Sequence, residues 1–118
     1  MGDTIYTGVF FSDGTHMTMS FRPSDAVIDA TPIGKTVCVR HTGDMANDDF
    51  YGISVTPMFD TTGITNRKPH ITFGTFGTFK AGDISDRMDD PSIITPIDGG
   101  IIYGRIGRFT TKGQVIFN

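Results

Sequence analysis

The stretch TIYTGVFFSDGTHMTMSFR, residues 4–22, contains the clearest structural signal in this chain. Two runs rich in β-branched and aromatic residues flank the turn sequence SDGT at 12–15. An Asp-Gly pair favours a tight hairpin turn because both residues tolerate positive φ angles. In the second run Met17, Met19 and Phe21 alternate with polar residues, which predicts a strand with one buried face. The segment therefore predicts an antiparallel β-hairpin.

The composition of the chain excludes a helical bundle. The 118 residues include no Leu, no Glu and no Trp, and only four Ala and four Lys, so most strong helix formers are scarce or missing. The chain instead contains 17 Thr, 14 Ile and six Val, whose β-branched side chains pack well on a pleated sheet. All 13 acidic residues are Asp, which prefers turns and caps to helix interiors. A chain of 118 residues suits one domain, and no linker divides it, so we expect a single β domain over residues 1–118.

The rest of the chain predicts further short strands separated by turns. The segment 24–32, which follows Pro23, is expected to form either a short edge strand around Ala26-Val27-Ile28 or an extended arm. We expect a polar loop over 42–49 and the longest irregular loop over 58–69. About eight short strands at a spacing of about ten residues predict an all-β, predominantly antiparallel fold, either a small barrel or a jelly-roll-like sandwich. The strands expected after the first hairpin are 36–41, 50–56, 70–80, 92–97, 100–109 and 114–118.

A repeated Phe-Gly-Thr unit makes the segment 71–80, ITFGTFGTFK, the most unusual in the chain. Its Phe residues recur every three positions, whereas side chains on a strand alternate every two. Phe73 and Phe79 are therefore expected on one face and Phe76 on the other. Either a β-bulge at a glycine redirects the chain, or aromatic rings occupy both faces of one strand. In the second case the outer ring is buried by the fold itself or belongs to an exposed apolar patch that a partner covers.

The charge distribution argues against nucleic acid as the main partner. The net charge is −3, and phosphate binding requires clustered positive charge. Residues 1–60 carry −5 and residues 61–118 carry +2, and the last 20 residues contain only Arg105, Arg108 and Lys112 as charged side chains. This asymmetry indicates either ordinary solvated surface or complementary faces that set the register between subunits.

No segment predicts a membrane span or export. Apolar runs such as Val9-Phe10-Phe11 are far shorter than the roughly 20 residues that a membrane helix needs. No basic segment precedes an apolar stretch, so we expect no secretory signal. The single cysteine, Cys38, has no partner for an internal disulfide, which suits a small strand residue made in a reducing compartment.

The polar residues do not form a recognised catalytic or metal-binding motif. Two acidic loops contain the oxygen ligands that calcium prefers, but neither has the spacing of an EF-hand, so we expect turn and cap roles. The three histidines are far apart in the sequence and lie in no known triad pattern. We therefore expect no enzyme, no catalytic residue, no metal and no cofactor. The sequence does not decide whether either acidic loop binds a cation; one contains Asp44, Asn47, Asp48 and Asp49, and the other Asp83, Asp86, Asp89 and Asp90. The histidines are His16, His41 and His70.

Two parts of the chain resemble a known family. The segment PIGKTVCV at 32–39 is followed by Gly43-Asp44 and by YGISV at 51–55. This order of glycine turn, strand, polar loop and glycine-containing apolar strand resembles small capsid decoration (cement) proteins of tailed bacteriophages. The end of the chain has a similar spacing of glycines, in PIDGG at 96–100 and at Gly104, Gly107 and Gly113. The resemblance implies a β-barrel or jelly roll that sits as dimers or trimers on the outer capsid surface and clamps neighbouring shell subunits.

A decoration protein of this kind implies the major capsid protein as partner, the virion capsid surface as location and synthesis in the host cytoplasm. It needs no catalytic group, only a stiff scaffold whose many weak contacts act together. No nucleic acid or membrane contact is implied. The residues expected to contact the shell or another subunit are Phe73, Phe76 and Phe79, with Val27 and Ile28 as an arm and Arg105, Arg108 and Lys112 as a polar rim.

Two other functions remain open at this point. One is a structural component of a phage tail, baseplate or head fibre, which differs from a shell protein in copy number. The other is a small glycan- or ligand-binding β-sandwich, in which Asp-rich loops and an exposed Tyr51 or Phe50 form the site.

Overall fold

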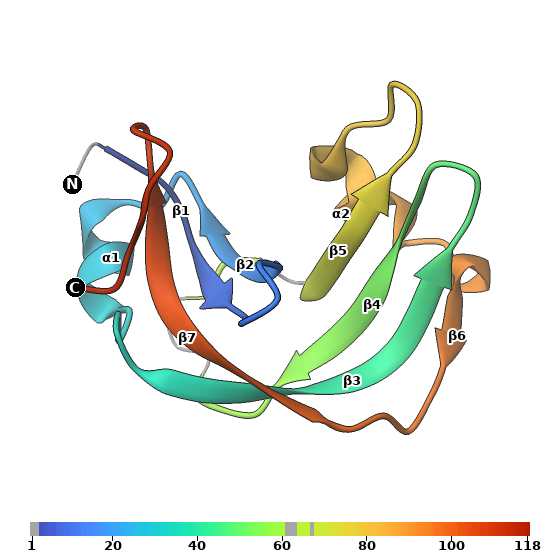
Figure 1. The fold of residues 1–118 in the computed structure, drawn as a ribbon, viewed down its shortest axis with the longest axis horizontal. Helices are drawn as coiled ribbons and strands as arrows, with labels where there is room; N and C mark the ends of the chain where they lie inside the picture. The colour runs from blue at the N-terminus through green and yellow to red at the C-terminus, as the bar shows by residue number, and fades with distance from the viewer. Residues whose placement is uncertain (1–2, 61–63, 67) are drawn as a thin grey trace.

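The computed structural model describes residues 3–60, 64–66 and 68–118, and these ranges contain eight β-strands and a few short helical segments (Figure 1). None of the helices in the described ranges is long and apolar enough to span a membrane. The strands are β1 (Thr4–Phe10), β2 (His16–Phe21), β3 (Thr36–Ala46), β4 (Phe50–Pro57), β5 (His70–Thr75), β6 (Ile94–Pro96), β7 (Ile101–Thr110) and β8 (Val115–Ile116). The helical segments are α1 (Asp25–Ala30), η1 (Ala81–Asp83), α2 (Ile84–Arg87) and η2 (Pro91–Ile93).

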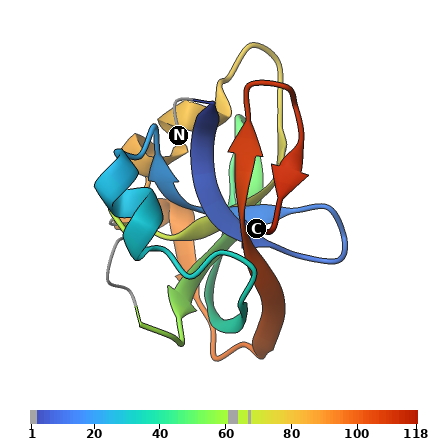
Figure 2. The ribbon, with the colours of Figure 1, turned by 90° about the vertical axis from the view of Figure 1, so that its left-hand side faces the viewer.

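Six of the described strands close into a barrel. The strand order is β6-β3-β4-β5-β2-β1-β7-β8, and an additional pairing of β3 with β7 joins the two sides. The ring β3-β4-β5-β2-β1-β7 is therefore closed, while β6 is attached to β3 and β8 to β7 (Figures 1 and 2). These strand pairs are antiparallel. The prediction of an all-β, antiparallel fold is confirmed, and the architecture is the barrel rather than the jelly-roll-like sandwich.

The first hairpin has the strands that its sequence predicts, but its turn differs: Asp13 does not take the positive φ that the Asp-Gly prediction requires, and the loop closes with a hydrogen bond from the backbone nitrogen of Phe11 to the carbonyl of Thr15 at 2.9 Å. Gly14 takes a φ of 88° in the turn, which a residue without a Cβ adopts at no steric cost. The carboxylate oxygen Oδ1 of Asp13 accepts hydrogen bonds from the backbone nitrogen of Thr15 at 2.9 Å and from its Oγ1 at 2.6 Å. These contacts fix the chain reversal and align β1 with β2.

A β-bulge in β2 changes the predicted alternation of side chains. Thr7 and Gly8 of β1 face Ser20 and Thr18, so Met19 is an extra residue between two paired positions. Met17 and Met19 are buried in the barrel, as predicted, but Phe21 is 62% exposed. The prediction that Phe21 shares the buried face is wrong, because the bulge shifts the pleat by one residue.

The main core lies inside the barrel and is built from small and medium side chains of all six strands. Branched and thioether side chains fill most of the narrow barrel interior, and Phe11 is the one aromatic ring among its buried members in the described ranges. Its buried members are Val9, Phe11, Met17, Met19, Val37, Val39, Ile53, Val55, Ile71 and Ile106.

The segment after Pro23 is a helix, so the expectation of an edge strand or an extended arm is wrong. The hydroxyl of Ser24 caps α1 by accepting a hydrogen bond from the backbone nitrogen of Val27 at 3.3 Å. At the other end, Oγ1 of Thr31 donates to the carbonyl of Val27 at 2.6 Å. Ile28 is 4% exposed and anchors the helix to the fold. The capping serine and this one anchor outweigh the β preference of two adjacent β-branched residues.

The polar loop expected over 42–49 is mostly strand. β3 continues to Ala46, so His41 lies within a strand rather than at its end. The chain reverses at Asn47, whose Oδ1 accepts hydrogen bonds from the backbone nitrogens of Asp49 at 2.8 Å and Phe50 at 3.0 Å. Polar residues are tolerated here because β3 has a solvent-facing side.

A second, smaller core lies where α2 covers the far end of β3 and β4. Met45, Phe50 and Ile84 are its buried residues. The sequence predicts a turn and an acidic stretch over residues 81–91, and the structure has helical segments there because Ile84 reaches this core. The partly buried side chains that pack around it are Phe79, Met88, Ile93 and Ile94.

Candidate functional site

The Phe-Gly-Thr segment contains a β-bulge, although its extra residue is Phe73 and not the glycine that the sequence predicts. Tyr51 of β4 faces Gly74, and the next residue, Gly52, faces Thr72, so Phe73 is the extra residue of β5. The strand ends at Thr75 instead of continuing to residue 80. The bulge and this early end give the three Phe side chains different surroundings.

Three aromatic rings gather where β4 begins and β5 ends, and we call Tyr51, Phe73 and Phe76 the tip cluster. The Tyr51 ring centroid lies 5.7 Å from that of Phe76 and 6.3 Å from that of Phe73. The three side chains are 44%, 43% and 49% exposed in the order Tyr51, Phe73 and Phe76. The backbone nitrogen of Phe76 donates to the carbonyl of Asp49 at 2.8 Å, which ties the end of β5 to the neighbouring turn. The tip cluster is therefore an exposed aromatic surface on a hydrogen-bonded backbone.

Phe79 does not join the tip cluster. Its ring stacks on Phe50 at 5.4 Å, and the guanidinium of Arg87 lies 5.3 Å from its centroid. Phe79 is therefore part of the smaller core, and the expectation that it shares a strand face with Phe73 is wrong because the strand ends before it. Phe50 is fully buried, so it is not an exposed residue of the kind that a glycan-binding site requires.

The other residues expected at a contact surface lie in separate places. Val27 and Ile28 both belong to α1. Ile28 is buried and Val27 is half-buried, so they do not form an arm. Arg105 donates from Nε to the carbonyl of Gly34 at 3.0 Å, and its guanidinium lies 4.6 Å from the centre of the Phe117 ring.

Arg108 and Lys112 are not gathered with Arg105 into one rim. The Arg108 side chain is only 11% exposed and faces Asp3 at 3.5 Å. Arg105 and Arg108 are three residues apart on β7, so they point to opposite faces of the strand. Lys112 is exposed in the turn between β7 and β8.

The acidic loops form turns, caps and ion pairs. Asp44 lies 2.7 Å from Nε2 of His41, and Asp49 lies 3.3 Å from Arg87. Asp90 caps η2 by accepting from the backbone nitrogen of Ser92 at 3.0 Å, and hydrogen bonding by the Ser92 side chain, together with this backbone bond, lowers the pKa of its carboxyl. Within the described ranges no group of three or more His, Cys, Asp or Glu side chains is arranged to hold a metal ion.

A cleft of about 530 Å³ lies on the outer face of β2 and β5, beneath the segment 81–85. Met17 faces Ile71 across the single paired position of these two strands, and both side chains point into the barrel core. The neighbouring residues of each strand therefore point outward, into the cleft. We call this space the histidine cleft; its lining residues are Tyr6, His16, Thr18, Phe21, Thr65, Asn66, His70, Thr72, Ala81, Gly82 and Ser85.

The two histidines of the cleft are held neutral at pH 7. Burial lowers the pKa of His16 below its ordinary value of 6.5, and the nearby His70 lowers it further. Burial also lowers the pKa of His70, which its hydrogen bond to the Lys68 carbonyl only partly opposes. Burial raises the pKa of Tyr6, so its hydroxyl is neutral as well. The cleft therefore presents polar groups without a net charge.

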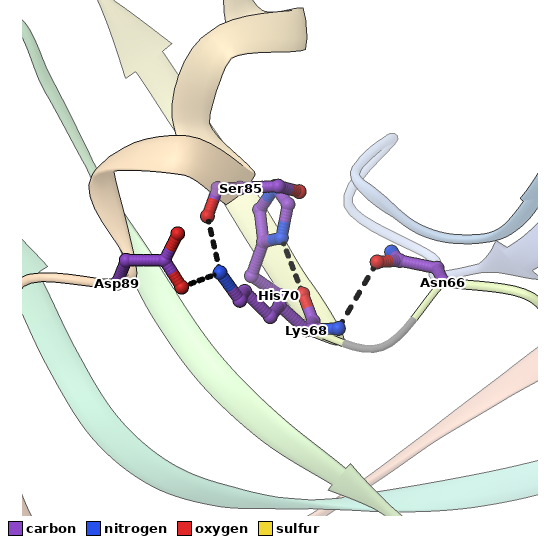
Figure 3. A network of polar contacts seen from close by, with 5 residues as sticks. All are labelled: Asn66, Lys68, His70, Ser85 and Asp89. Carbon is purple, nitrogen blue, oxygen red and sulfur yellow. Dashed lines mark hydrogen bonds and ion pairs between the residues drawn. The ribbon is translucent and has the colours of Figure 1, made fainter.

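A network of polar contacts fixes the loop that borders the cleft (Figure 3). Nζ of Lys68 donates to the carbonyl of Ser85 at 3.1 Å and forms an ion pair with Asp89. The side chain of Asn66 accepts from the backbone nitrogen of Lys68 at 3.1 Å and donates to the carbonyl of Thr18 at 2.9 Å. These contacts tie the loop to α2 on one side and to β2 on the other.

The sequence alone did not identify the cleft. His16 was predicted on the solvent-facing side of its strand, and His70 at the start of another, but nothing in the sequence indicates that these strands pair. The signal is the alternation itself: residues 16 and 18 on β2 and 70 and 72 on β5 are polar on the same face. That signal becomes useful only once the pairing of β2 with β5 is known.

Comparisons with known proteins give no relative for this chain: no family model matches it, and neither a curated protein nor a solved structure does so. The chain is thus described by its fold, a closed six-stranded antiparallel barrel with two additional strands in the described residues.

Proposed function

We propose that this protein is a virion structural protein that decorates the outer surface of a capsid and stabilises neighbouring shell subunits. In this role its partner is the major capsid protein, and it acts as a homo-oligomer of two or three copies. The proposal combines the resemblance of its glycine-punctuated strands to phage decoration proteins with the surface that the barrel presents.

The tip cluster is the observation that carries the proposal. Water-exposed aromatic rings that contact one another form an apolar surface, and such surfaces commonly mark protein-binding sites. Tyrosine and phenylalanine are enriched at interfaces, where a few large side chains contribute much of the binding energy. The rings lie where β4 begins and β5 ends, and both of these strands belong to the closed barrel. A rigid support reduces the entropy that is lost on binding.

A positive side chain suits a contact with a second neighbour. In Figure 1 the turn between β7 and β8 lies on the opposite side of the barrel from the end of β5. Lys112 is exposed in that turn, where it can meet an acidic surface. A protein that touches two shell subunits through separate faces gains avidity from weak contacts. This arrangement supports a clamping role.

Binding to undecorated shells tests the proposal. Purified protein is mixed at micromolar concentration with undecorated shells of the virus that encodes it, and co-sedimentation is measured. We expect Phe76→Ala and Tyr51→Ala each to weaken binding about tenfold or more. The matched control is Tyr103→Ala, which removes an aromatic ring that is 70% exposed outside the tip cluster. A wild-type protein that does not sediment with the shells contradicts the proposal.

Copy number distinguishes the shell from a tail, baseplate or head-fibre location. A decoration protein is present in hundreds of copies per particle, whereas a tail component follows the threefold or sixfold axis of the tail. Quantitative mass spectrometry of intact particles measures this ratio.

Tyr51 also favours a second function, the binding of a glycan. An exposed aromatic ring offers an apolar face on which a sugar ring can stack, and Tyr51 is 44% exposed. Glycan-array binding that Tyr51→Ala abolishes, together with no binding to shells, would favour this function over decoration.

A further inference from the structure

The histidine cleft has the size and shelter of a small-molecule site. Its volume of about 530 Å³ lies within the range of about 300 to 1,000 Å³ that is common for ligand pockets. Its walls come from β1, β2 and β5, from the loop around Asn66 and from η1 and α2. The tip cluster contributes no side chain to it, so the cleft is a separate feature from the proposed shell contact.

The described lining of the cleft disfavours a strongly charged ligand. Among the side chains that line it in the described ranges, none is Asp, Lys or Arg. The closest cation in the polar network, Lys68, is already engaged by the Ser85 carbonyl and by Asp89 (Figure 3). A buried ionic group without a partner is costly, so a phosphate or carboxylate would find no compensation here.

His70 presents a defined hydrogen-bond acceptor. Its Nδ1 lies 2.8 Å from the carbonyl oxygen of Lys68, and a carbonyl only accepts, so Nδ1 carries the proton. In the neutral ring Nε2 is then an acceptor. Thr18, Thr72 and Ser85 add hydroxyl groups that both donate and accept. The cleft therefore suits a ligand that bears several polar groups, at least one of them a donor.

A stack of rings leads into the cleft from the side of β1. The Tyr6 ring lies 5.1 Å from Phe109 of β7 and 4.8 Å from His16 of β2, with interplanar angles of 20° and 19°. Since β1 lies between β7 and β2, Tyr6 is the middle ring of this stack. Phe10 of β1 also stacks on His16, with the ring centroids 5.7 Å apart, and the rings of Tyr6 and His16 both line the cleft. A planar ring in the cleft can extend the stack, which an aliphatic ligand does less well.

We propose that the histidine cleft binds an uncharged planar heterocycle with hydrogen-bonding substituents, of the nucleobase or nucleoside class. The ring stacks at the His16 end of the aromatic column, a donor of the base bonds to Nε2 of His70, and the hydroxyl groups bind the remaining polar atoms. This function does not depend on shell binding, because it uses different residues.

Calorimetric titration with three sets of probes tests the proposal. The probes are the four common ribonucleosides, their 5′-monophosphates and the neutral disaccharides maltose and cellobiose, each up to about 1 mM. We expect at least one nucleoside to bind, its monophosphate to bind no more tightly, and the disaccharides not to bind. In a nuclear magnetic resonance spectrum of the wild-type protein, the same nucleoside should shift the imidazole resonances of His16 and His70.

Variants connect the binding to the cleft. We expect His70→Gln to weaken nucleoside binding about tenfold, because it replaces the fixed imidazole acceptor and ring with a flexible amide, and Thr72→Val to weaken it severalfold, because it removes a hydroxyl group. Thr95→Val is the matched control: the same change on an exposed residue of β6 should leave binding unchanged. Thr72→Val retains shape and volume, so it remains informative if His70→Gln does not fold.

Several outcomes would overturn the proposal. They are the absence of binding by every nucleoside, preferential binding of a disaccharide, tighter binding of the monophosphate, or an equal effect of Thr72→Val and Thr95→Val. None of these results depends on whether the protein binds shells.

Discussion

The ring of Tyr51 lies directly over the backbone of Gly74, its partner across the β4–β5 pair: a Cβ on residue 74 would stand 2.6 Å from Cε1 of that ring. Residue 74 must therefore lack a side chain for Tyr51 to occupy its place in the tip cluster. The geometry of the tip cluster therefore depends on Gly74, a residue that contributes no ring to it.

We expect Gly74→Ala to displace the Tyr51 ring while the barrel remains folded. The obstructing atoms belong to an exposed side chain that can rotate away, so the free energy of unfolding should change by less than about 1 kcal/mol. Nuclear Overhauser contacts between the rings of Tyr51 and Phe76 should weaken. Gly100→Ala is the control, because no atom lies within 4 Å of a Cβ at that position. Unchanged ring contacts in Gly74→Ala would contradict this account of the tip cluster.

Gly52→Ala should behave differently, because the obstruction at that site is backbone. A Cβ on residue 52 would collide with the carbonyl oxygen of Ile71 and lie 3.2 Å from Cα of Thr72. These atoms belong to the paired strand and cannot move without disturbing the bulge. We expect a loss of about 1 to 3 kcal/mol in the free energy of unfolding, measured by urea denaturation. A loss no greater than that of Gly74→Ala would show that the sheet adapts here.

Stability should fall as the solution is acidified below about pH 6.5. The pKa values of His16 and His70 are lowered in the folded protein, so the unfolded chain takes up protons first and acid favours unfolding. The loss begins near the ordinary pKa of 6.5 and ends once the pH is below the folded values. In the part of the chain that the structure describes, the other ionisable groups beside this pair are Tyr6 and the engaged Lys68, and neither supplies a negative charge to offset it.

Urea denaturation between pH 8 and pH 5 measures this dependence. The double variant His16→Gln/His70→Gln should show a flatter profile than the wild type in this window. Asp13 and Asp90 have lowered pKa values, so their contributions are lost only at lower pH. An identical slope in the wild type and the double variant would contradict the assignment.

Ile28→Ala should destabilise the protein although Ile28 lies in a helix of only six residues. Ile28 is 4% exposed, and its removal leaves a cavity beneath α1. We expect a loss of about 2 to 4 kcal/mol in the free energy of unfolding by urea denaturation. The neighbouring Ala26 is exposed, so Ala26→Ser is the control and should have little effect. If both variants are equally stable, α1 is not anchored as described.

The second helical region shows why some elements were not predictable from local sequence. Residues 84–87, ISDR, contain no strong helix former besides Arg87. They form α2 because Ile84 is fully buried against Phe50 and Met45. Those residues come from β3 and β4, about 35 positions earlier in the chain, so the contact that favours the helix is absent from the local sequence.

The amino-acid sequence by itself determined the class of the fold. Side-chain stiffness, the Asp-Gly turn and strand alternation act over a few neighbouring residues, which is why the first hairpin and the all-β antiparallel class could be predicted. The period-three Phe repeat likewise required either a bulge or aromatic rings on both faces, and the bulge is present at Phe73.

Only the tertiary structure decided how the barrel closes and what its outer face presents. The pairing of β3 with β7 and of β2 with β5 joins segments more than 50 residues apart, and no local preference specifies such partners. The bulges at Met19 and Phe73 reset which side chains face outward. The histidine cleft follows from the pairing of β2 with β5 and the tip cluster from the pairing of β4 with β5, because each is made of residues that become neighbours only when these strands are in register.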